Sequence, residues 1–231
     1  SQFIVFNWNK ASDPFKQSLF GSDKFRKAMS HLINRQAVID LVYGGLGTPM
    51  YSSVYPVLTQ WLNPKVPKYE YDPKQAVKLL GELGFTRKDK EGYLVNSKGQ
   101  RIEFTLATNA GNAQREQIAK LFVDEAKKVG VKVNFTPIDF NTLVGQLLSS
   151  GPDRPFDAIL IGLTGGGLDW PFGPNVVPCK GNLHMWNKSG QCLDPRETQL
   201  DALYSRGRTE LDFQKRQQIG YQMQEAEAQL V

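Results

Sequence analysis

The residues of this chain that most often carry out chemistry are few, and none has the spacing of an enzyme or metal site. There are two histidines, and no His-x-x-His, Cys-x-x-Cys or His-Glu-x-x-His pattern indicates a metal ion. His31 falls inside a predicted helix, where a structural role is the simpler interpretation. No Gly-x-Ser-x-Gly elbow or phosphate-binding loop is present. The sequence therefore predicts no catalytic residue, no metal and no cofactor.

A run of three glycines, Gly165 to Gly167, is the one segment that resembles a phosphate-binding loop. It follows a predicted strand, but it leads into Leu168-Asp169-Trp170-Pro171 instead of a helix. No helix N-terminus would therefore face an anion, and a turn is the better interpretation. The 23 acidic residues are too many to single out a general acid and base.

The two cysteines, Cys179 and Cys192, enclose a polar segment rich in turn-forming residues. A disulfide that closed this loop would stabilise the fold by about 3 kcal/mol in the chain-entropy model, and would point to an oxidising compartment. The alternative is two unrelated buried thiols, and the spacing alone leaves both open.

Composition describes an ordinary globular protein, with 231 residues, 40% hydrophobic residues and a net charge of +5. Basic residues alternate with acidic ones, as in residues 87–91, so no nucleic-acid partner is expected. The longest apolar run, residues 158–163, is far shorter than a membrane span. No charged and apolar leader begins at Ser1, so any signal peptide is expected to lie outside this chain.

Hydrophobic periodicity predicts helices that alternate with strands. The predicted elements, in order, are strand 2–8, helix 22–43, loop 47–67, helix 73–83, a hairpin of 93–95 with 102–106, helix 113–129, strand 131–138, helix 140–148, strand 156–163, helix 197–206 and helix 212–231. Ser22 and Asp72 are candidate N-caps, and Gly130 is a candidate C-terminal stop. Strands 131–138 and 156–163, joined by a short helix, predict a parallel βαβ unit. The whole is predicted to be α/β, with helices packed on a mixed sheet.

Five segments carry motifs in a recognisable order over nearly the whole chain. They are Pro14-Phe15 with residues 25–39 (FRKAMSHLINRQAVI), residues 71–85 (YDPKQAVKLLGELGF), residues 102–135, residues 156–169, and a tail with Asp201 and Asp212-x-x-Lys215-Arg216. Together they resemble the extracellular solute-binding proteins, family 5, of ABC importers, the type that binds dipeptides and oligopeptides. Two departures are residues 16–22, which look like an insertion, and Asn34, where the family has aspartate.

The resemblance implies a periplasmic-binding-protein-like fold of type II, of which residues 1–231 would be a single domain, the second lobe. The first lobe is expected before Ser1 and the return crossover after Val231, so the chain is expected to be a fragment. The family also implies the Cys179–Cys192 disulfide and an extracytoplasmic location, in the periplasm or at the cell surface, with a lipid anchor as one mode of attachment. It implies no enzyme activity.

The resemblance places the ligand beyond the carboxyl ends of the strands. In dipeptide-binding relatives an aspartate after the glycine-rich turn pairs with the ligand's α-ammonium group, and Asp169 matches that position best. Trp170 and Phe140 are expected either to form aromatic walls or to pack in the core. Arg115 is expected either to meet the ligand's carboxylate or to be solvated. The complete set of expected ligand-binding residues is Asp169, Trp170, Thr164, Asn109, Phe140 and Arg115.

The expected partners are a small peptide and the membrane permease of an ABC transporter, and the protein is expected to be a monomer. Two lobes would close on the ligand by hinge motion, so one lobe alone would bind weakly or undetectably. One alternative is another solute on the same fold, such as a sugar, a metal chelate or an opine. The other is an unrelated enzyme, which would have a complete pocket within this chain, whereas a lobe would present an open face with Asp169 exposed.

Overall fold

The computed structural model describes residues 1–164, 169–170 and 173–230. The elements over these residues are β1 (Gln2–Phe6), α1 (Pro14–Gly21), α2 (Asp23–His31), α3 (Arg35–Val42), α4 (Pro73–Glu82), β2 (Arg87–Lys88), β3 (Leu94–Val95), β4 (Glu103–Asn109), α5 (Ala113–Val129), β5 (Lys132–Ile138), α6 (Phe140–Leu148), β6 (Ala158–Gly162), α7 (Pro195–Thr209) and α8 (Phe213–Leu230). The mixed α/β class predicted from the sequence is confirmed. No helix of this described part is long and apolar enough to span a bilayer.

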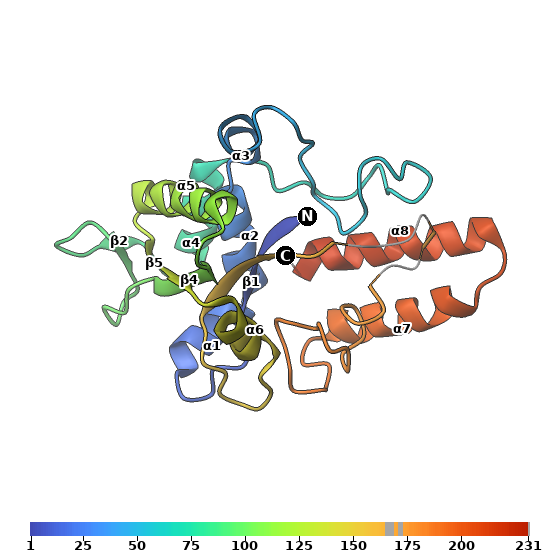
Figure 1. Ribbon diagram of the computed structural model, residues 1–231. Coiled ribbons are helices and arrows are strands. Elements are labelled where there is room, and N and C mark those ends of the chain that lie inside the picture. The colour runs from blue at the N-terminus through green and yellow to red at the C-terminus, as the bar shows by residue number, and fades with distance from the viewer. Residues whose placement is uncertain (165–168, 171–172, 231) are drawn as a thin grey trace.

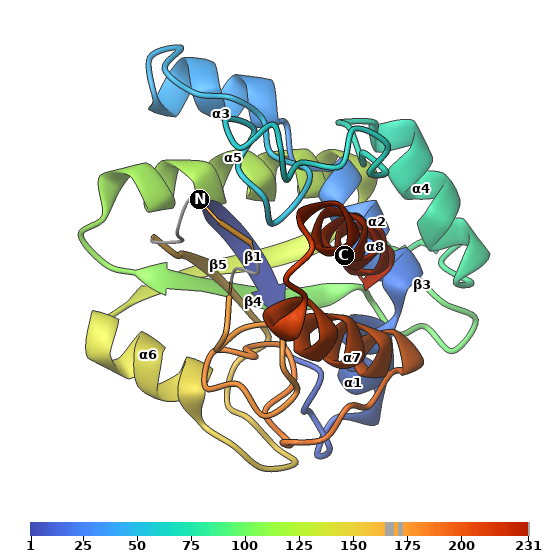
Figure 2. The ribbon, with the colours of Figure 1, turned by 90° about the vertical axis from the view of Figure 1, so that its right-hand side faces the viewer.

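The main sheet has the strand order β1-β6-β4-β5, with β4 parallel to both β5 and β6 and with β1 antiparallel to β6. Strands β5 and β6 therefore run parallel, as the βαβ pattern predicted, but β4 lies between them. Helix α5 covers one face of the sheet and α6 the other, while α7 and α8 form an antiparallel pair beyond its edge (Figures 1 and 2).

One predicted helix is divided in the structure, and two other predicted segments have additional features. The single helix expected over residues 22–43 is divided into α2 and α3, because the Asn34 side chain accepts a hydrogen bond from the Ala37 N–H and begins a new helix. Residues 16–21, expected as part of an insertion, belong to α1, which Asp13 caps.

The expected hairpin is present around its turn, because Val95 forms an antiparallel bridge with Arg101 and the Ile102 N–H donates to the Leu94 carbonyl oxygen at 3.1 Å. In addition β3 pairs with β2, and the second arm continues as β4 of the main sheet.

Helix ends follow the local signals in the sequence. Ser22 and Asp72 accept hydrogen bonds from backbone N–H groups in the first turns of α2 and α4, as predicted. Gly130 ends α5 in the left-handed conformation, with φ of 92°. A side chain at this glycine would be strained and would also meet the Gly92 carbonyl oxygen at 3.0 Å.

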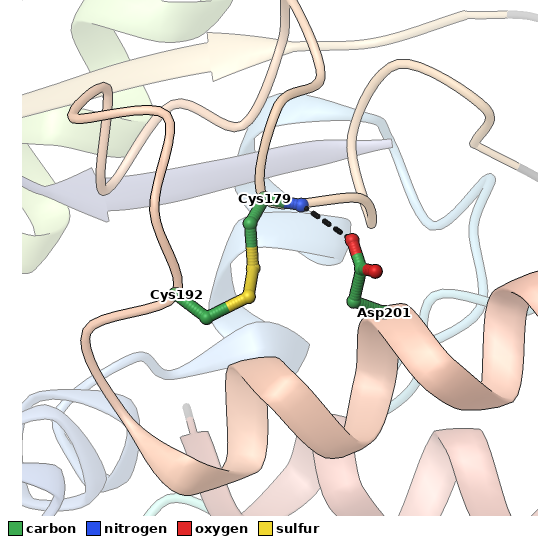
Figure 3. Close-up of side chains that lie close together, drawn as sticks. All are labelled: Cys179, Cys192 and Asp201. Carbon is green, nitrogen blue, oxygen red and sulfur yellow. Dashed lines mark hydrogen bonds between the residues drawn. A yellow bond between two sulfur atoms is a disulfide. The ribbon is translucent and has the colours of Figure 1, made fainter.

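A disulfide joins Cys179 to Cys192, which confirms the predicted pairing (Figure 3). The Cα atoms are 5.4 Å apart, a usual separation for a disulfide. Asp201 of α7 lies beside the bridge, and its Oδ1 accepts a hydrogen bond of 3.0 Å from the Cys179 N–H. Both sulfur atoms are used by the bridge, so this trio provides no thiolate for a metal ion.

Glu197 of α7 organises the interior of the disulfide loop. Its fully buried carboxylate pairs with His184 Nε2 at 2.9 Å and accepts hydrogen bonds from Trp186 Nε1 at 2.7 Å and from the Leu193 N–H at 2.6 Å. Burial acts to raise the pKa of Glu197, but the hydrogen bonds, first that with His184, hold the pKa below its usual value. The loop is thus attached to α7 through one carboxylate as well as through the disulfide.

We expect Glu197→Ala to lower the free energy of unfolding by about 3–5 kcal/mol, because it leaves several buried donors without an acceptor. Urea denaturation monitored by circular dichroism measures this loss. Glu70→Ala is the control, since Glu70 is exposed. A loss below about 1 kcal/mol, equal to that of the control, would contradict the role given to Glu197.

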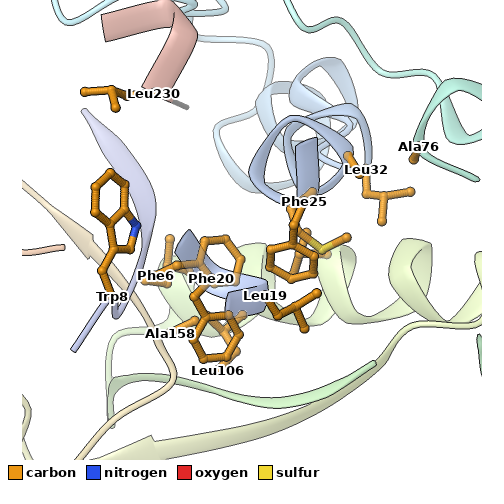
Figure 4. Close-up of a cluster of buried hydrophobic side chains, with 14 of the residues drawn as sticks. Phe6, Trp8, Leu19, Phe20, Phe25, Leu32, Ala76, Leu106, Ala158 and Leu230 are labelled. Atoms are coloured by element: carbon orange, nitrogen blue, oxygen red, sulfur yellow. The ribbon is translucent and has the colours of Figure 1, made fainter. Parts of the chain in front are cut away.

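Apolar side chains fill both faces of the main sheet. On the α5 face, Phe6, Phe25 and Phe104 form edge-on ring pairs with centroids 5.2 to 6.0 Å apart. Figure 4 shows Phe6 and Phe25 in this cluster. On the α6 face, a second cluster includes Val5, Leu143 and Ile159. Neighbouring strand residues such as Val5 and Phe6 enter opposite clusters because side chains alternate along a strand. Both faces of the sheet therefore bury apolar side chains.

The loop predicted over residues 47–67 lies within a longer segment, residues 44–72, that contains no helix or strand and lies along α8. This segment is held by side chains of its own: Tyr69 donates to the Ala228 carbonyl oxygen at 2.7 Å, and Ser53 donates to Glu227 Oε2 at 2.5 Å. Gln224 donates in turn to the Trp61 carbonyl oxygen at 2.7 Å. Burial of the Glu227 carboxyl raises its pKa to about 7, against an ordinary value of 4.5.

Stability is expected to depend on the proton held by Glu227. The raised pKa means that the folded protein keeps this proton between pH 4.5 and about 7 while the unfolded chain releases it. Stability therefore falls as pH rises through that range, by about 3 kcal/mol. Denaturation at pH 5 and pH 7 should show that Glu227→Gln abolishes this part of the pH dependence, whereas Glu225→Gln, an exposed neighbour on α8, retains it. Equal pH dependence in both variants would contradict the assignment.

Candidate functional site

The carboxyl ends of β4, β5 and β6 and the amino end of β1 meet along one edge of the sheet. The pairing of Asn109 with Ile138 aligns the ends of β4 and β5, and the pairing of Gln2 with Gly162 places the start of β1 beside the end of β6. Ligands of open α/β sheets bind beyond the carboxyl ends of parallel strands. Four of the six expected ligand-binding residues lie on the segments that meet here, namely Asn109, Arg115, Phe140 and Thr164.

Arg115, in the first turn of α5, is held against this edge. Its Nη1 donates to Asn109 Oδ1 at 2.7 Å, and its Nε donates to Gln2 Oε1 at 3.0 Å. The structure thus joins two residues predicted separately and adds Gln2, which the sequence analysis missed. Within the described part of the chain no carboxylate lies within ion-pair distance of Arg115, so amide dipoles orient the guanidinium without neutralising it.

Gly162 makes the approach of Gln2 possible. A Cβ atom at position 162 would lie 2.6 Å from Gln2 Oε1 and 2.7 Å from the Ser1 carbonyl oxygen. The absence of a side chain at the end of β6 therefore leaves the space in which the Gln2 amide contacts Arg115. Nothing in the sequence marks this glycine as different from others, because its role depends on the pairing of distant strands.

Asp139 and Phe140 follow β5 at the same edge. Asp139 caps α6, and hydrogen bonds, first that from the Thr142 N–H, hold its pKa below the usual value, so it is ionised at neutral pH. Phe140 is 50% exposed, so the core-packing alternative weighed for this residue is wrong. An exposed aromatic ring therefore lies next to a fixed negative charge. Thr164, two residues after β6, is exposed as well.

Trp170 is in the core, so the interpretation of Trp170 as an aromatic wall is wrong for this structure. The side chain is 1% exposed and its indole ring lies 6.3 Å from that of Trp61. It enters between α7 and α8 at two glycines, where a Cβ at Gly207 would lie 2.2 Å from the indole and a Cβ at Gly220 would lie 3.4 Å away. The core-packing alternative applies to this residue because the two glycines provide its slot.

Asp169 precedes this buried tryptophan and has the opposite character. Its carboxylate is 63% exposed, and Oδ2 lies 3.4 Å from Arg216 Nη2 of α8. The anchor expected for a ligand ammonium is therefore accessible but already has a cationic neighbour. The glycine run of residues 165–167, predicted as a turn, lies outside the described residues.

Two hollows with defined linings are found away from this edge. One, of ≈ 360 Å³, is lined by residues that include Phe15, Arg101 and Asn134, near the amino ends of β4 and β5. The other, of ≈ 550 Å³, lies between α7 and α8. Neither lining contains an expected ligand-binding residue. The lobe interpretation of this edge stays a prediction.

We expect Gly207→Ala to destabilise the protein by about 1–3 kcal/mol, because the added methyl group overlaps the Trp170 ring. Thermal or urea denaturation measures this change. Gly81→Ala is a matched control in α4, where a Cβ would meet no atom within 4 Å, and a helical glycine replaced by alanine should be neutral or stabilising. Equal stability of the two variants would contradict the close packing of Trp170 against Gly207.

The chain matches known proteins over most of its length. Residues 1–179 match the family described as bacterial extracellular solute-binding proteins, family 5, middle region. A probable ABC transporter-binding protein of Deinococcus radiodurans is 50% identical over 98% of this chain and 39% of its own length. Oligopeptide-binding protein AppA of Bacillus subtilis is 32% identical over 69% of this chain and 28% of its own length.

Solved structures agree in fold. AppA of Bacillus subtilis in complex with a nonapeptide superimposes with a TM-score of 0.79, at 25% identity, over 99% of this chain and 42% of that protein. An oligopeptide-binding protein of Thermus thermophilus complexed with a pentapeptide has a TM-score of 0.79 at 22% identity, over 98% of this chain and 39% of its own. The type II periplasmic binding fold is thereby confirmed. The chain spans about two-fifths of the length of these proteins.

Proposed function

Because this chain belongs to the bacterial extracellular solute-binding proteins of family 5, we propose that it is one lobe of a receptor that captures small peptides for an ABC importer. In this proposal residues 1–231 form a single domain, and a second lobe completes the site. The receptor acts as a monomer outside the cytoplasm and delivers its ligand to the membrane permease. The family and its structural neighbours are transport proteins and not enzymes, and we propose no catalysis for this chain.

One observation carries the proposal: Arg115 is an oriented, un-neutralised cation at the edge of the sheet where ligands of this architecture bind. Asn109 and Gln2 fix its Nη1 and Nε through amide oxygens. A peptide carboxylate is the natural complement of such a guanidinium, since it accepts charge-assisted hydrogen bonds. The relatives named for oligopeptide binding share this fold over the region that contains Arg115.

The remaining expected residues support the same ligand class. Asp169 offers an exposed carboxylate for the peptide's ammonium group. Phe140 offers an exposed ring for a peptide side chain, and Thr164 and Asn109 offer polar groups at the edge. Closure of a second lobe over this open face would exclude water and strengthen each of these contacts.

A second candidate ligand is an anionic metal chelate, which an un-neutralised guanidinium would also attract. NikA of Brucella suis, described in complex with Fe(III)-EDTA, has a TM-score of 0.77 with this chain, at 20% identity. Such a likeness speaks to fold alone, so Fe(III)-EDTA serves as a competing ligand in the test.

The test is calorimetric titration of a two-lobed protein containing this chain with penta-alanine, with C-terminally amidated penta-alanine, and with Fe(III)-EDTA. We expect penta-alanine to bind, and Arg115→Gln to weaken it about 10- to 100-fold, which is the loss of one charged hydrogen bond of roughly 1.5–3 kcal/mol. The amidated peptide should bind the parent weakly and be unaffected by the substitution. Lys120→Gln, which removes an exposed charge from the same helix, is the matched control.

Other outcomes separate the candidates. Binding of Fe(III)-EDTA alone, lost in Arg115→Gln, would replace the peptide assignment with the chelate. Peptide binding that Arg115→Gln and Lys120→Gln affect equally would keep the peptide assignment but remove Arg115 from the site.

A further inference from the structure

Contacts with Trp61 hold the Arg216 side chain of α8 beside Asp169. Its guanidinium lies over the Trp61 ring, 5.3 Å from the centroid, and Trp61 is itself fully buried against Trp170 and Phe213. The Arg216 side chain is 24% exposed, and its Nε is buried without a hydrogen-bond partner among the described residues. An arginine that stacks on a buried aromatic ring has few alternative rotamers, so it stays close to its carboxylate neighbour.

Asp169 is held from the other side. Trp170, the next residue, is fixed in the slot between Gly207 and Gly220, so the backbone that carries the Asp169 carboxylate is anchored to the same two helices that carry Arg216. The two charges meet at 3.4 Å, Oδ2 to Nη2, with the carboxylate 63% exposed. Such an exposed pair is weak, and a second cation of suitable geometry can replace or share it.

We infer that Arg216 is an internal counter-ion of Asp169, and that it sets how strongly the site binds a ligand's ammonium group. This inference rests on the proposed peptide-binding function. In the ligand-free protein Arg216 occupies one oxygen of the carboxylate. A peptide ammonium then exchanges an existing ion pair for a new one, and gains less than it would from a free carboxylate. Arg216 thereby lowers affinity for the ammonium group and leaves contacts to the rest of the peptide unchanged.

The difference between Arg115 and Asp169 shows why the Arg216 counter-ion affects selectivity. Arg115 has no carboxylate partner among the described residues, whereas Asp169 has Arg216. The site would therefore respond more strongly to the carboxylate end of a peptide than to its ammonium end. Removal of Arg216 should restore the balance between the two ends.

The experiment compares penta-alanine with N-acetyl-penta-alanine by calorimetric titration of the two-lobed protein and its variants. We expect Arg216→Gln to strengthen binding of penta-alanine about 3- to 10-fold and to leave the acetylated peptide unchanged. Asp169→Asn should weaken penta-alanine to the level of the acetylated peptide, and in that background Arg216→Gln should have no further effect. Arg208→Gln, which removes an exposed charge from α7, controls for net charge.

Each other result overturns the inference. If Arg216→Gln weakens penta-alanine, or changes both peptides equally, then Arg216 is a ligand contact or a structural residue and not a competitor. If the parent binds both peptides equally well, then Asp169 is no ammonium anchor, and the peptide function stands without this inference. If the parent binds neither peptide, the proposed function itself fails. Circular dichroism of each variant verifies that the α7–α8 pair remains folded.

Discussion

The antiparallel pairing of β1 with β6 is the constraint on which most of this structure depends. It brings the first strand of the chain to the last strand of the sheet, with Gln2 opposite Gly162 and Phe6 opposite Ala158. Joining segments so far apart in sequence has an entropic cost, which the burial of apolar groups on both faces of β1 must offset. Val5 enters the cluster under α6, and Phe6 enters the aromatic cluster under α5. The Asn7 amide continues the attachment beyond the strand, with a 2.7 Å hydrogen bond to the Phe156 carbonyl oxygen.

The same pairing prepares the open edge of the sheet. Without β1 beside β6, Gln2 would not reach Arg115, and the guanidinium would be held by Asn109 alone. The charge of Arg115 and its orientation therefore have separate origins. The charge comes from a residue of α5, whereas the orientation comes from Asn109 at the end of β4 and from Gln2 of the distant strand β1. The edge is a product of topology as much as of side-chain chemistry.

The sequence predicted those features that depend on neighbouring residues. Helices α4, α5 and α6, the Asp72 and Gly130 caps, and the strands around them follow from periodicity and from short motifs such as Asp72-Pro73. The division of the helix at Asn34 was missed because apolar residues continue at helical spacing across the break. The hairpin turn at residues 96–99 was predicted, but the additional pairing of β3 with β2 was missed because the two charged residues of β2 carry no periodic signal.

The sequence located the residues near the strand ends but did not predict which of them are buried. Trp170 and Phe140 are both aromatic residues close to strand ends, yet one is buried and the other half exposed. The difference lies in the glycines of α7 and α8, which provide space for the Trp170 indole. No sequence pattern near Trp170 predicts this space. The partners Gln2 and Arg216 were missed for the same reason, since each reaches the site from a distant element.

The burial of Trp170 also gives the protein an optical property. An indole in a dry, rigid environment emits at shorter wavelength than one in water, and the Trp61 ring, 6.3 Å away, is close enough for excitation energy to pass between them. Trp170 directly follows Asp169, so a movement that draws the backbone of these two residues away from α8 also changes the surroundings of the fluorophore. The chain thus contains its own spectroscopic reporter at the point where a charged group meets the helical pair.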